Sequence, residues 1–484
     1  MSNRVEKKLA QQMSRLPIVS DPRTRQADFR IGFIWAALAT AIVAGFAIGA
    51  HLTFVIGFDL PLGRGFSSFV QTHGHVQLVG WVGLFIIGIS LHVIPRLASV
   101  PIANPRWIPR ILWLMAAGLL LRTAGQTVLP YLEGSYLFAP WSGLAAGSGL
   151  LEFIGIVLYV SLLIRTFRGI GNIRLQPALL SVRPYFGMMA TGWLLYALLN
   201  LVLLADMAVR QDVVVNQGWN EVAIQVFLDL ALLPVAFAFS VRMLPLYLTL
   251  RAADWPVRGT AYVYLVFVGL QVIPASPLVV GLAPGVAGLL SNLGMLLKGG
   301  VILWFVWQFD ILTRRHAPWT VKREIQPLPD KRPTRPGLPD YGEFGRFERL
   351  VYAAYVWLVM AAIFEMLVGG AGLVRHTLPI PADAVRHLYL LGFITLLIFG
   401  LSVRLIPGLL KKKCVASPAL VDATFWLGMA AVACRVLPLL LPPALAEGIP
   451  ASVRVAQAAF AFSGIVGLAA VLCLAVNLWR SVTS

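Results

Sequence analysis

The stretch HVQLVGWVGLFIIGISLHVIPRL, residues 75–97, decides the fold of this chain, because it recurs as HLYLLGFITLLIFGLSVRLIPGL at residues 387–409. In both copies, glycines stand 5 and 13 residues after the first histidine and a proline stands 20 residues after it. Each copy has about the 20 apolar residues that a helix needs to cross a bilayer. A histidine within such a span is energetically costly, so His75 and His387 predict a paired role, most commonly the ligation of a metal or a haem iron.

A third, weaker copy of the pattern begins at Gln225. Pro245 again stands 20 residues on, and Ala238 takes the place of the second glycine. A further echo links Gln271-Val-Ile-Pro to Arg435-Val-Leu-Pro. The second, sixth and tenth spans are therefore equivalent, which predicts three units of four helices. The other explanation is that membrane helices resemble one another because Leu, Gly and Val dominate them.

The composition is that of a membrane protein. Of the 484 residues, 58% are hydrophobic and 12% are charged, whereas about a quarter of the residues of a soluble protein are charged. We predict an all-α polytopic membrane protein with about twelve transmembrane helices in three four-helix repeats. The predicted spans are 31–57, 74–96, 107–129, 142–167, 182–206, 219–250, 258–276, 286–312, 347–371, 384–408, 419–441 and 453–479.

The net charge of +18 reports orientation and not nucleic-acid binding. If Met1 is cytoplasmic, 31 of the 39 Lys and Arg residues fall in inner loops or at inner helix ends, and five fall in outer loops. This positive-inside bias predicts a multi-pass protein of a bacterial inner membrane with both termini in the cytoplasm. The basic inner surface is also expected to attract anionic membrane lipid.

Four segments follow from this pattern. Residues 1–30 form a basic cytoplasmic segment with no apolar core, so no cleavable signal peptide is expected. Residues 31–312 hold helices 1–8 as two units, and 347–484 hold the third unit. The Pro-, Arg- and Asp-rich stretch 313–346 between them is expected to be a cytoplasmic linker.

The first candidate site is a haem b held by His75 and His387. Both histidines fall near the outer leaflet at similar depth in the predicted topology. The three cysteines form neither a CxxC nor a CxxCH motif, so the haem would be held by ligands alone. The alternative is a pair of core histidines hydrogen-bonded to neighbouring side chains.

Arg122 and Arg435 each belong to the helix that follows a repeat histidine. Haem propionates are anions that need guanidinium donors in a low-dielectric place, and these two arginines lie at a suitable depth. The alternative is that they pair with an intramembrane acid. The candidate acids are Glu152, Asp229 and Glu365, which with Lys298 must face the interior and could form a proton path.

His51 and His73 form a second candidate metal site. Both lie near the outer membrane face in the predicted topology, and imidazole is a suitable copper ligand. His73 stands two residues before His75, so the two rings would point to opposite sides of a helix, and His73 could also lie in the loop before the helix. The alternative is two hydrogen-bonded histidines at the interface.

The segments THGHVQLVGWVGLFIIGISLHVIPRL and RHLYLLGFITLLIFGLSVRLIPGLL resemble the NnrS family. The resemblance extends over all twelve spans, although the motifs are of modest specificity. It implies a polytopic bacterial membrane protein with haem and copper, linked to nitric oxide metabolism and nitrosative stress. The usual family pattern has an acid after the second histidine, and Val76 stands there in this chain.

The architecture also resembles the catalytic subunits of haem-copper oxidases and nitric oxide reductases. Those subunits have twelve helices in three arcs, with low-spin haem ligands on helices two and ten. Their dinuclear metal centre requires histidines on helices six and seven. This chain has Gln225 at the repeat position and no histidine in either predicted span. The resemblance therefore implies a haem site and argues against a dinuclear reductase.

These patterns favour a haem protein that acts in nitric oxide response or electron transfer, with nitric oxide or an electron donor as partner. A proton-coupled transporter is one alternative, in which the histidines and buried charges form a path. An assembly factor for a respiratory oxidase is another. The sequence does not distinguish an enzyme from a sensor or carrier, and it does not give the oligomeric state.

The basic asymmetry makes the topology testable with reporter fusions. Fusions after residue 330 and at the C-terminus should report the cytoplasm, and a fusion near Pro140 should report the periplasm, because Lys and Arg collect on the inner side. A periplasmic signal from residue 330 would overturn the helix count and the placing of His75 and His387 on one side.

Overall fold

The computed structural model describes residues 29–170, 177–316, 342–441 and 450–483, and all regular secondary structure in these ranges is helical. Within these ranges, eleven helices are long and apolar enough to cross a membrane. A shorter apolar helix, Val257–Val272, occupies the place of the seventh predicted span. The all-α polytopic fold is thus confirmed. Residues 1–28 of the N-terminal segment and 317–341 of the linker lie outside the described residues.

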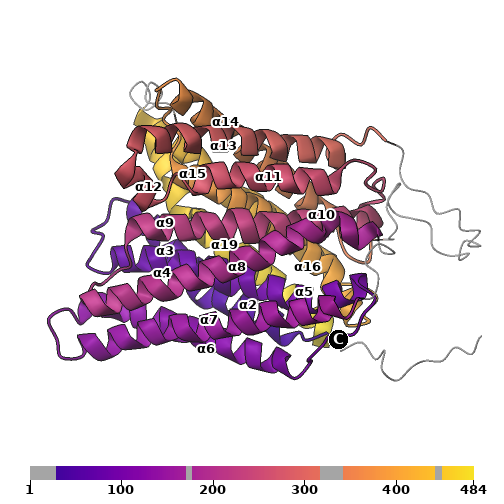
Figure 1. Ribbon diagram of the computed structural model, residues 1–484, viewed down its shortest axis with the longest axis horizontal. Coiled ribbons are helices and arrows are strands. Elements are labelled where there is room, and N and C mark those ends of the chain that lie inside the picture. Colours follow the sequence, from indigo (N-terminus) through magenta and orange to yellow (C-terminus); the bar gives the residue numbers. More distant parts are fainter. Residues whose placement is uncertain (1–28, 171–176, 317–341, 442–449, 484) are drawn as a thin grey trace, which may run out of the picture.

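Several spans are built from consecutive helical pieces, and Figure 1 labels most of the α-helices among them. Three prolines lie in the last turn of a span, as expected from the loss of a backbone donor: Pro95, Pro245 and Pro407. The helices, with η for π or 3-10 segments, are α2 (Gly32–Thr40), η2 (Ala41–Phe46), α3 (Ala47–Gly57), α4 (Phe66–His75), η3 (Val76–Gly83), α5 (Leu84–Leu97), α6 (Trp107–Val128), η4 (Leu129–Tyr131), α7 (Phe138–Arg168), α8 (Pro177–Arg210), α9 (Gln217–Val226), η6 (Phe227–Leu232), α10 (Leu233–Leu248), α11 (Val257–Val272), α12 (Pro277–Leu282), α13 (Pro284–Phe309), α14 (Phe347–Leu373), α15 (Ala382–His387), η7 (Leu388–Thr395), α16 (Leu396–Leu409), α17 (Pro418–Val436), η8 (Leu437–Leu440) and α19 (Pro450–Thr483).

The three repeat-related spans form the centre of the molecule. In the apolar 18-residue window of spans Phe66–Leu97, Gln217–Leu248 and Ala382–Leu409, 94%, 83% and 78% is buried, whereas the figure for the other eight long spans among the described residues is 28–56%. In Figure 1, α4, α9 and α15 lie at one end of the bundle and α5, α10 and α16 at the other. These central spans therefore run in the same direction, and the remaining helices shield them from lipid.

Each central span changes from α-helix to π-helix within two residues of the repeat position. The π segments η3 and η7 begin directly after His75 and His387, and η6 begins two residues after Gln225. π-Helix makes up well under 1% of residues in proteins and is frequent at functional sites. The first span also contains a π segment, η2, so this geometry supports the likeness of the three central spans without being confined to them. The division into three four-helix units itself stays a prediction.

The repeated glycines allow each histidine-bearing span to approach the helix before it. A Cβ atom at any of them would lie within 3.0 Å of that neighbour, closer than ordinary contact permits. Their positions are therefore explained by close helix packing. The contacts are Gly80 with Thr40, Gly88 with Phe33, Gly392 with Trp357 and Gly400 with Val351.

Gly88→Ala should destabilise the protein, because the added Cβ would lie 2.6 Å from Cβ of Phe33. Overpacking of this kind costs about 1–3 kcal/mol. The matched control is Gly187→Ala in α8, where the space beside the glycine is open. Thermal unfolding in detergent should show a lower midpoint for Gly88→Ala only, and equal midpoints would contradict the packing.

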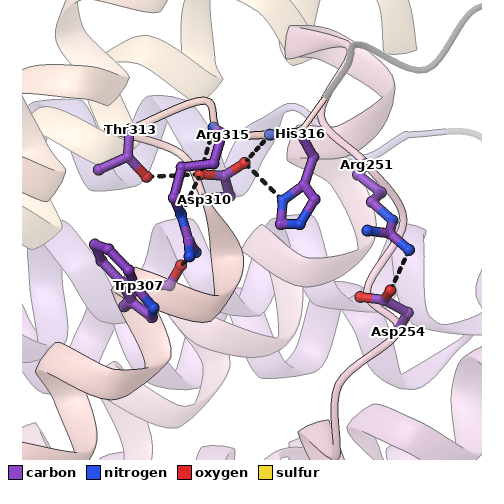
Figure 2. A network of polar contacts seen from close by, with 7 residues as sticks. All are labelled: Arg251, Asp254, Trp307, Asp310, Thr313, Arg315 and His316. Carbon is purple, nitrogen blue, oxygen red and sulfur yellow. Dashed lines mark hydrogen bonds and ion pairs between the residues drawn. The ribbon is translucent and has the colours of Figure 1, made fainter.

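The chain leaves α13 through a network centred on Asp310 (Figure 2). Its carboxylate accepts hydrogen bonds from Thr313 Oγ1 at 2.6 Å, from the backbone N–H groups of Arg315 and His316 at 2.9 Å each, and from the His316 ring at 3.0 Å. The Arg315 guanidinium lies over the Trp307 ring. Burial raises the pKa of Asp310, but these hydrogen bonds outweigh it and hold the pKa well below its usual range.

Asp310→Asn should loosen this turn and expose it to protease. Because the folded-state pKa is depressed, the stabilisation is complete above the unfolded pKa of about 3.9 and is lost as the pH falls through the folded value. At neutral pH, tryptic cleavage after Arg314 and Arg315 should rise about tenfold or more, since hydrogen bonds to a charged group contribute about 1.5–3 kcal/mol each. The control is Asp254→Asn, which removes only the exposed ion pair with Arg251. Equal cleavage in both variants would rule out this role for Asp310.

Candidate functional site

A cavity lies between the central spans that carry the repeat histidines. Its walls come from the first, second, fifth, sixth, tenth, eleventh and twelfth spans, near the end where α4, α9 and α15 lie (Figure 1). Most of the wall is apolar, with Leu78 and Trp81 on one side and Leu390 and Leu391 on the other. The polar part of the wall contains His73, His75, Asp383, Arg386, His387 and Arg435.

Nδ1 of both His73 and His387 lies against a backbone carbonyl in this cavity, and Nδ1 of His387 is also 3.2 Å from the Asp383 carboxylate. Nδ1 of His73 is 2.8 Å from the carbonyl oxygen of Gly45, and Nδ1 of His387 is 2.8 Å from that of Asp383. A carbonyl oxygen can only accept, so each Nδ1 carries the proton and each Nε2 keeps its lone pair. No partner for either Nε2 is found within the described ranges. His73 also lies close enough to His387 and Arg435 to interact with them electrostatically.

The first span leaves room for the His73 ring. A Cβ atom at Gly49 would lie 2.6 Å from Cε1 of His73. The ring thus lies directly against the backbone of α3, one turn from the carbonyl of Gly45 that holds it. The sequence allowed His73 to lie in a loop, and the structure corrects this, because α4 begins at Phe66 and contains His73.

His75 points to the other side of the helix and is fully engaged. Its Nδ1 is 2.9 Å from the hydroxyl of Tyr196, and its Nε2 is 3.0 Å from Glu152. Asn200 donates a second hydrogen bond to that carboxylate. His75 borders the cavity as well, but neither ring nitrogen is free for a ligand. Both ring nitrogens of His75 thus have partners, whereas His73 and His387 each have a partner at Nδ1 only among the described contacts.

The two candidate arginines separate in the same way. Arg435 lines the cavity, donates to Asp383 through Nη2 at 2.6 Å, and has its buried Nη1 without a partner. Arg122 is 2% exposed, lies beside Glu152, and has both Nε and Nη1 without partners. Arg122 is not among the residues that line the cavity. Arg435 thus lines the same cavity as His387, whereas Arg122 lies beside Glu152, the partner of His75.

The proposed copper pair is not brought together. His51 is exposed and packs edge-on against Phe69. His51 stands two residues after Gly49, which faces His73. Because two residues turn a helix by about 200°, His51 points away from His73. Over the residues that the structure describes, no group of three or more His, Cys, Asp or Glu side chains forms a metal site.

Three of the intramembrane charges meet at one place between the second and third predicted units. Lys298 Nζ lies 2.8 Å from Asp229 and 2.9 Å from Glu365. The fourth charge, Glu152, belongs to His75. The sequence showed that these side chains must face the interior, but not which of them are partners.

Comparisons with known proteins show the fold. No protein-family model matches the chain, and no curated protein matches it. One similar solved structure, determined by cryo-EM, is a haem-copper terminal oxidase dimer. The similarity covers 94% of this chain and 83% of the oxidase chain, with a TM-score of 0.56 and 14% sequence identity. The predicted architectural likeness to haem-copper oxidases is confirmed at the level of the fold, and the resemblance to NnrS stays a prediction.

Proposed function

We propose that the chain is a multi-pass membrane haem protein that holds haem b between His73 and His387. One observation carries the proposal: both rings border the same cavity, with Nδ1 fixed by a backbone carbonyl and Nε2 free. Ligating histidines in proteins almost always donate their other ring N–H in this way, which fixes the tautomer and the ring orientation. This ligand pair replaces the pairing of His75 with His387 that the repeat favoured.

The rest of the cavity also suits a haem. Its apolar walls match a macrocycle, and the unpartnered Nη1 of Arg435 is available to a propionate. Asp383 restrains the same guanidinium from the other side and accepts from His387 through its backbone. A bound haem would supply one-electron chemistry, and its potential would depend on the burial and hydrogen bonding of its ligands.

Ligation by two histidines suits electron transfer, or gas sensing by loss of one ligand, better than reduction of a substrate. We therefore propose an NnrS-like role in nitric oxide response or electron transfer at the bacterial inner membrane. The fold shared with a haem-copper oxidase supports a respiratory context. Copper has less support, because His51 and His73 do not face each other.

Visible spectroscopy of purified variants tests the ligand assignment. The wild-type protein should give a reduced-minus-oxidised haem b spectrum. His73→Ala and His387→Ala should each lose most of it, because each removes an axial nitrogen. His75→Ala should keep it, since His75 is bonded to Tyr196 and Glu152.

The control is His51→Ala, which removes an exposed imidazole from the same end of the bundle. Loss of haem in His75→Ala, with retention in His73→Ala, would restore the pairing that the repeat predicts. A colourless wild-type protein from haem-replete cells would end the haem proposal, and the transporter and assembly-factor alternatives would then lead.

A further inference from the structure

The cluster of Asp229, Lys298 and Glu365 connects three helices through hydrogen-bonded ion pairs. Lys298 Nζ donates to both oxygens of Asp229, at 2.8 and 2.9 Å, and lies 2.9 Å from Oε1 of Glu365. Asp229 and Lys298 are 0% exposed and Glu365 is 5% exposed. The three side chains come from η6, α13 and α14, so the cluster ties the sixth, eighth and ninth spans together.

Uncharged polar groups complete the cluster. Gln225 donates to Asp229 at 2.5 Å, Gln271 donates to Glu365 at 2.9 Å, and Tyr389 lies 2.6 Å from Oε2 of Glu365. Tyr264 donates to the backbone carbonyl of Asp229, and Tyr185 lies close enough to Tyr264 to interact with it. Within the described part of the chain, no other charged side chain forms a hydrogen bond or ion pair with the three.

The charges in this cluster do not balance. Two ionised carboxylates and one ammonium leave a net charge of −1 in the membrane interior, where an uncompensated charge costs several kcal/mol. One added proton makes the cluster neutral without moving a helix. The added proton would lie on a carboxylate oxygen, and the Tyr389 hydroxyl, which donates to Glu365 when that carboxylate is ionised, can instead accept a hydrogen bond from the Glu365 carboxylic acid.

We propose that Asp229 and Glu365 share one exchangeable proton, which makes the Asp229–Lys298–Glu365 cluster an intramembrane proton-binding site. Because the two carboxylates interact through one ammonium, the proton belongs to the pair and not to either residue. Lys298 keeps the second carboxylate ionised, so the site takes one proton and not two. No bound metal is required for this role.

The structure also connects this site to the cavity. Gln225 is half-buried and bonds Asp229, and its neighbour Ile224 lines the cavity wall. Tyr389 stands two residues after His387, on the same helix. Chain neighbours of the cluster thus border the cavity, at the end of the bundle where α9 begins. If haem is bound as proposed above, an electron delivered by a one-electron donor would raise the proton affinity of the carboxylate pair, with the proton taken from water at that end.

Infrared titration tests the site without any need for haem. The wild-type protein should show one protonated carboxylic acid band from this cluster, which disappears as the pH rises. Asp229→Asn and Glu365→Gln should each abolish that titrating band. In either variant the remaining ionised carboxylate and the Lys298 ammonium already form a neutral pair, which needs no added proton. Lys298→Met should instead give two protonated acids, since neither carboxylate keeps a counter-ion.

Asp212→Asn, which changes an exposed loop acid, is the control for solvent-exposed carboxylates. Asp229→Asn and Glu365→Gln both leave a neutral pair, so each is expected to fold. The double variant leaves Lys298 alone and should fold far less well. A wild-type protein with no titrating acid band, or a band unchanged in both single variants, would overturn the proton-binding site.

The connection to the cavity has its own test, which rests on the proposed haem. The haem midpoint potential should fall as the pH rises, by at most about 59 mV per tenfold change in proton concentration. This slope should be lost in Asp229→Asn and Glu365→Gln, while the spectrum stays that of wild type. A pH-independent potential in wild type would overturn the connection alone. The absence of a haem spectrum would overturn the proposed function and leave the infrared result standing.

Discussion

A polar group inside a bilayer has no water to bond, so it must find its partner within the protein. This constraint explains where the polar residues of the central spans lie. His75 meets Glu152 and Tyr196, Lys298 meets two acids, and His73 meets a backbone carbonyl. The groups that break the rule are therefore informative. Nη1 of Arg435 is buried without a partner beside the cavity, and a haem propionate is the partner that we propose for it.

The overall fold was predictable because it depends on composition and period. Apolar runs of bilayer length predicted twelve spans, and the structure has eleven long helices with a shorter one in the seventh place. The repeat correctly singled out the second, sixth and tenth spans, which are the most buried. The glycine positions were also informative. Glycine has no side chain, so a repeated glycine in a span indicates where a neighbouring helix packs closely.

The site was predictable only in part. The spacing of His73 and His75 correctly placed them on opposite sides of a helix, but the choice between them depended on residues from other spans. Glu152 and Tyr196 lie 77 and 121 residues from His75 along the chain. Nothing in a local pattern indicates that they occupy its ring nitrogens. The grouping of Asp229, Lys298 and Glu365 was hidden for the same reason.

The π segments have a consequence for how this chain relates to others of its fold. Each residue turns an α-helix by about 100°, and a π turn contains an extra residue. The side chains after a π turn therefore point in different directions, relative to those before it, than they would in a continuous α-helix. In the second span, η3 separates His73 from Gly88, which fixes the contact with the first span. Removing one residue from Val76–Gly83 would keep that contact and swing the imidazole a quarter turn or more out of the cavity. The direction in which His73 points is thus encoded by the number of residues between it and the glycine, so a comparison that ignores such single-residue insertions would match the wrong faces of these helices.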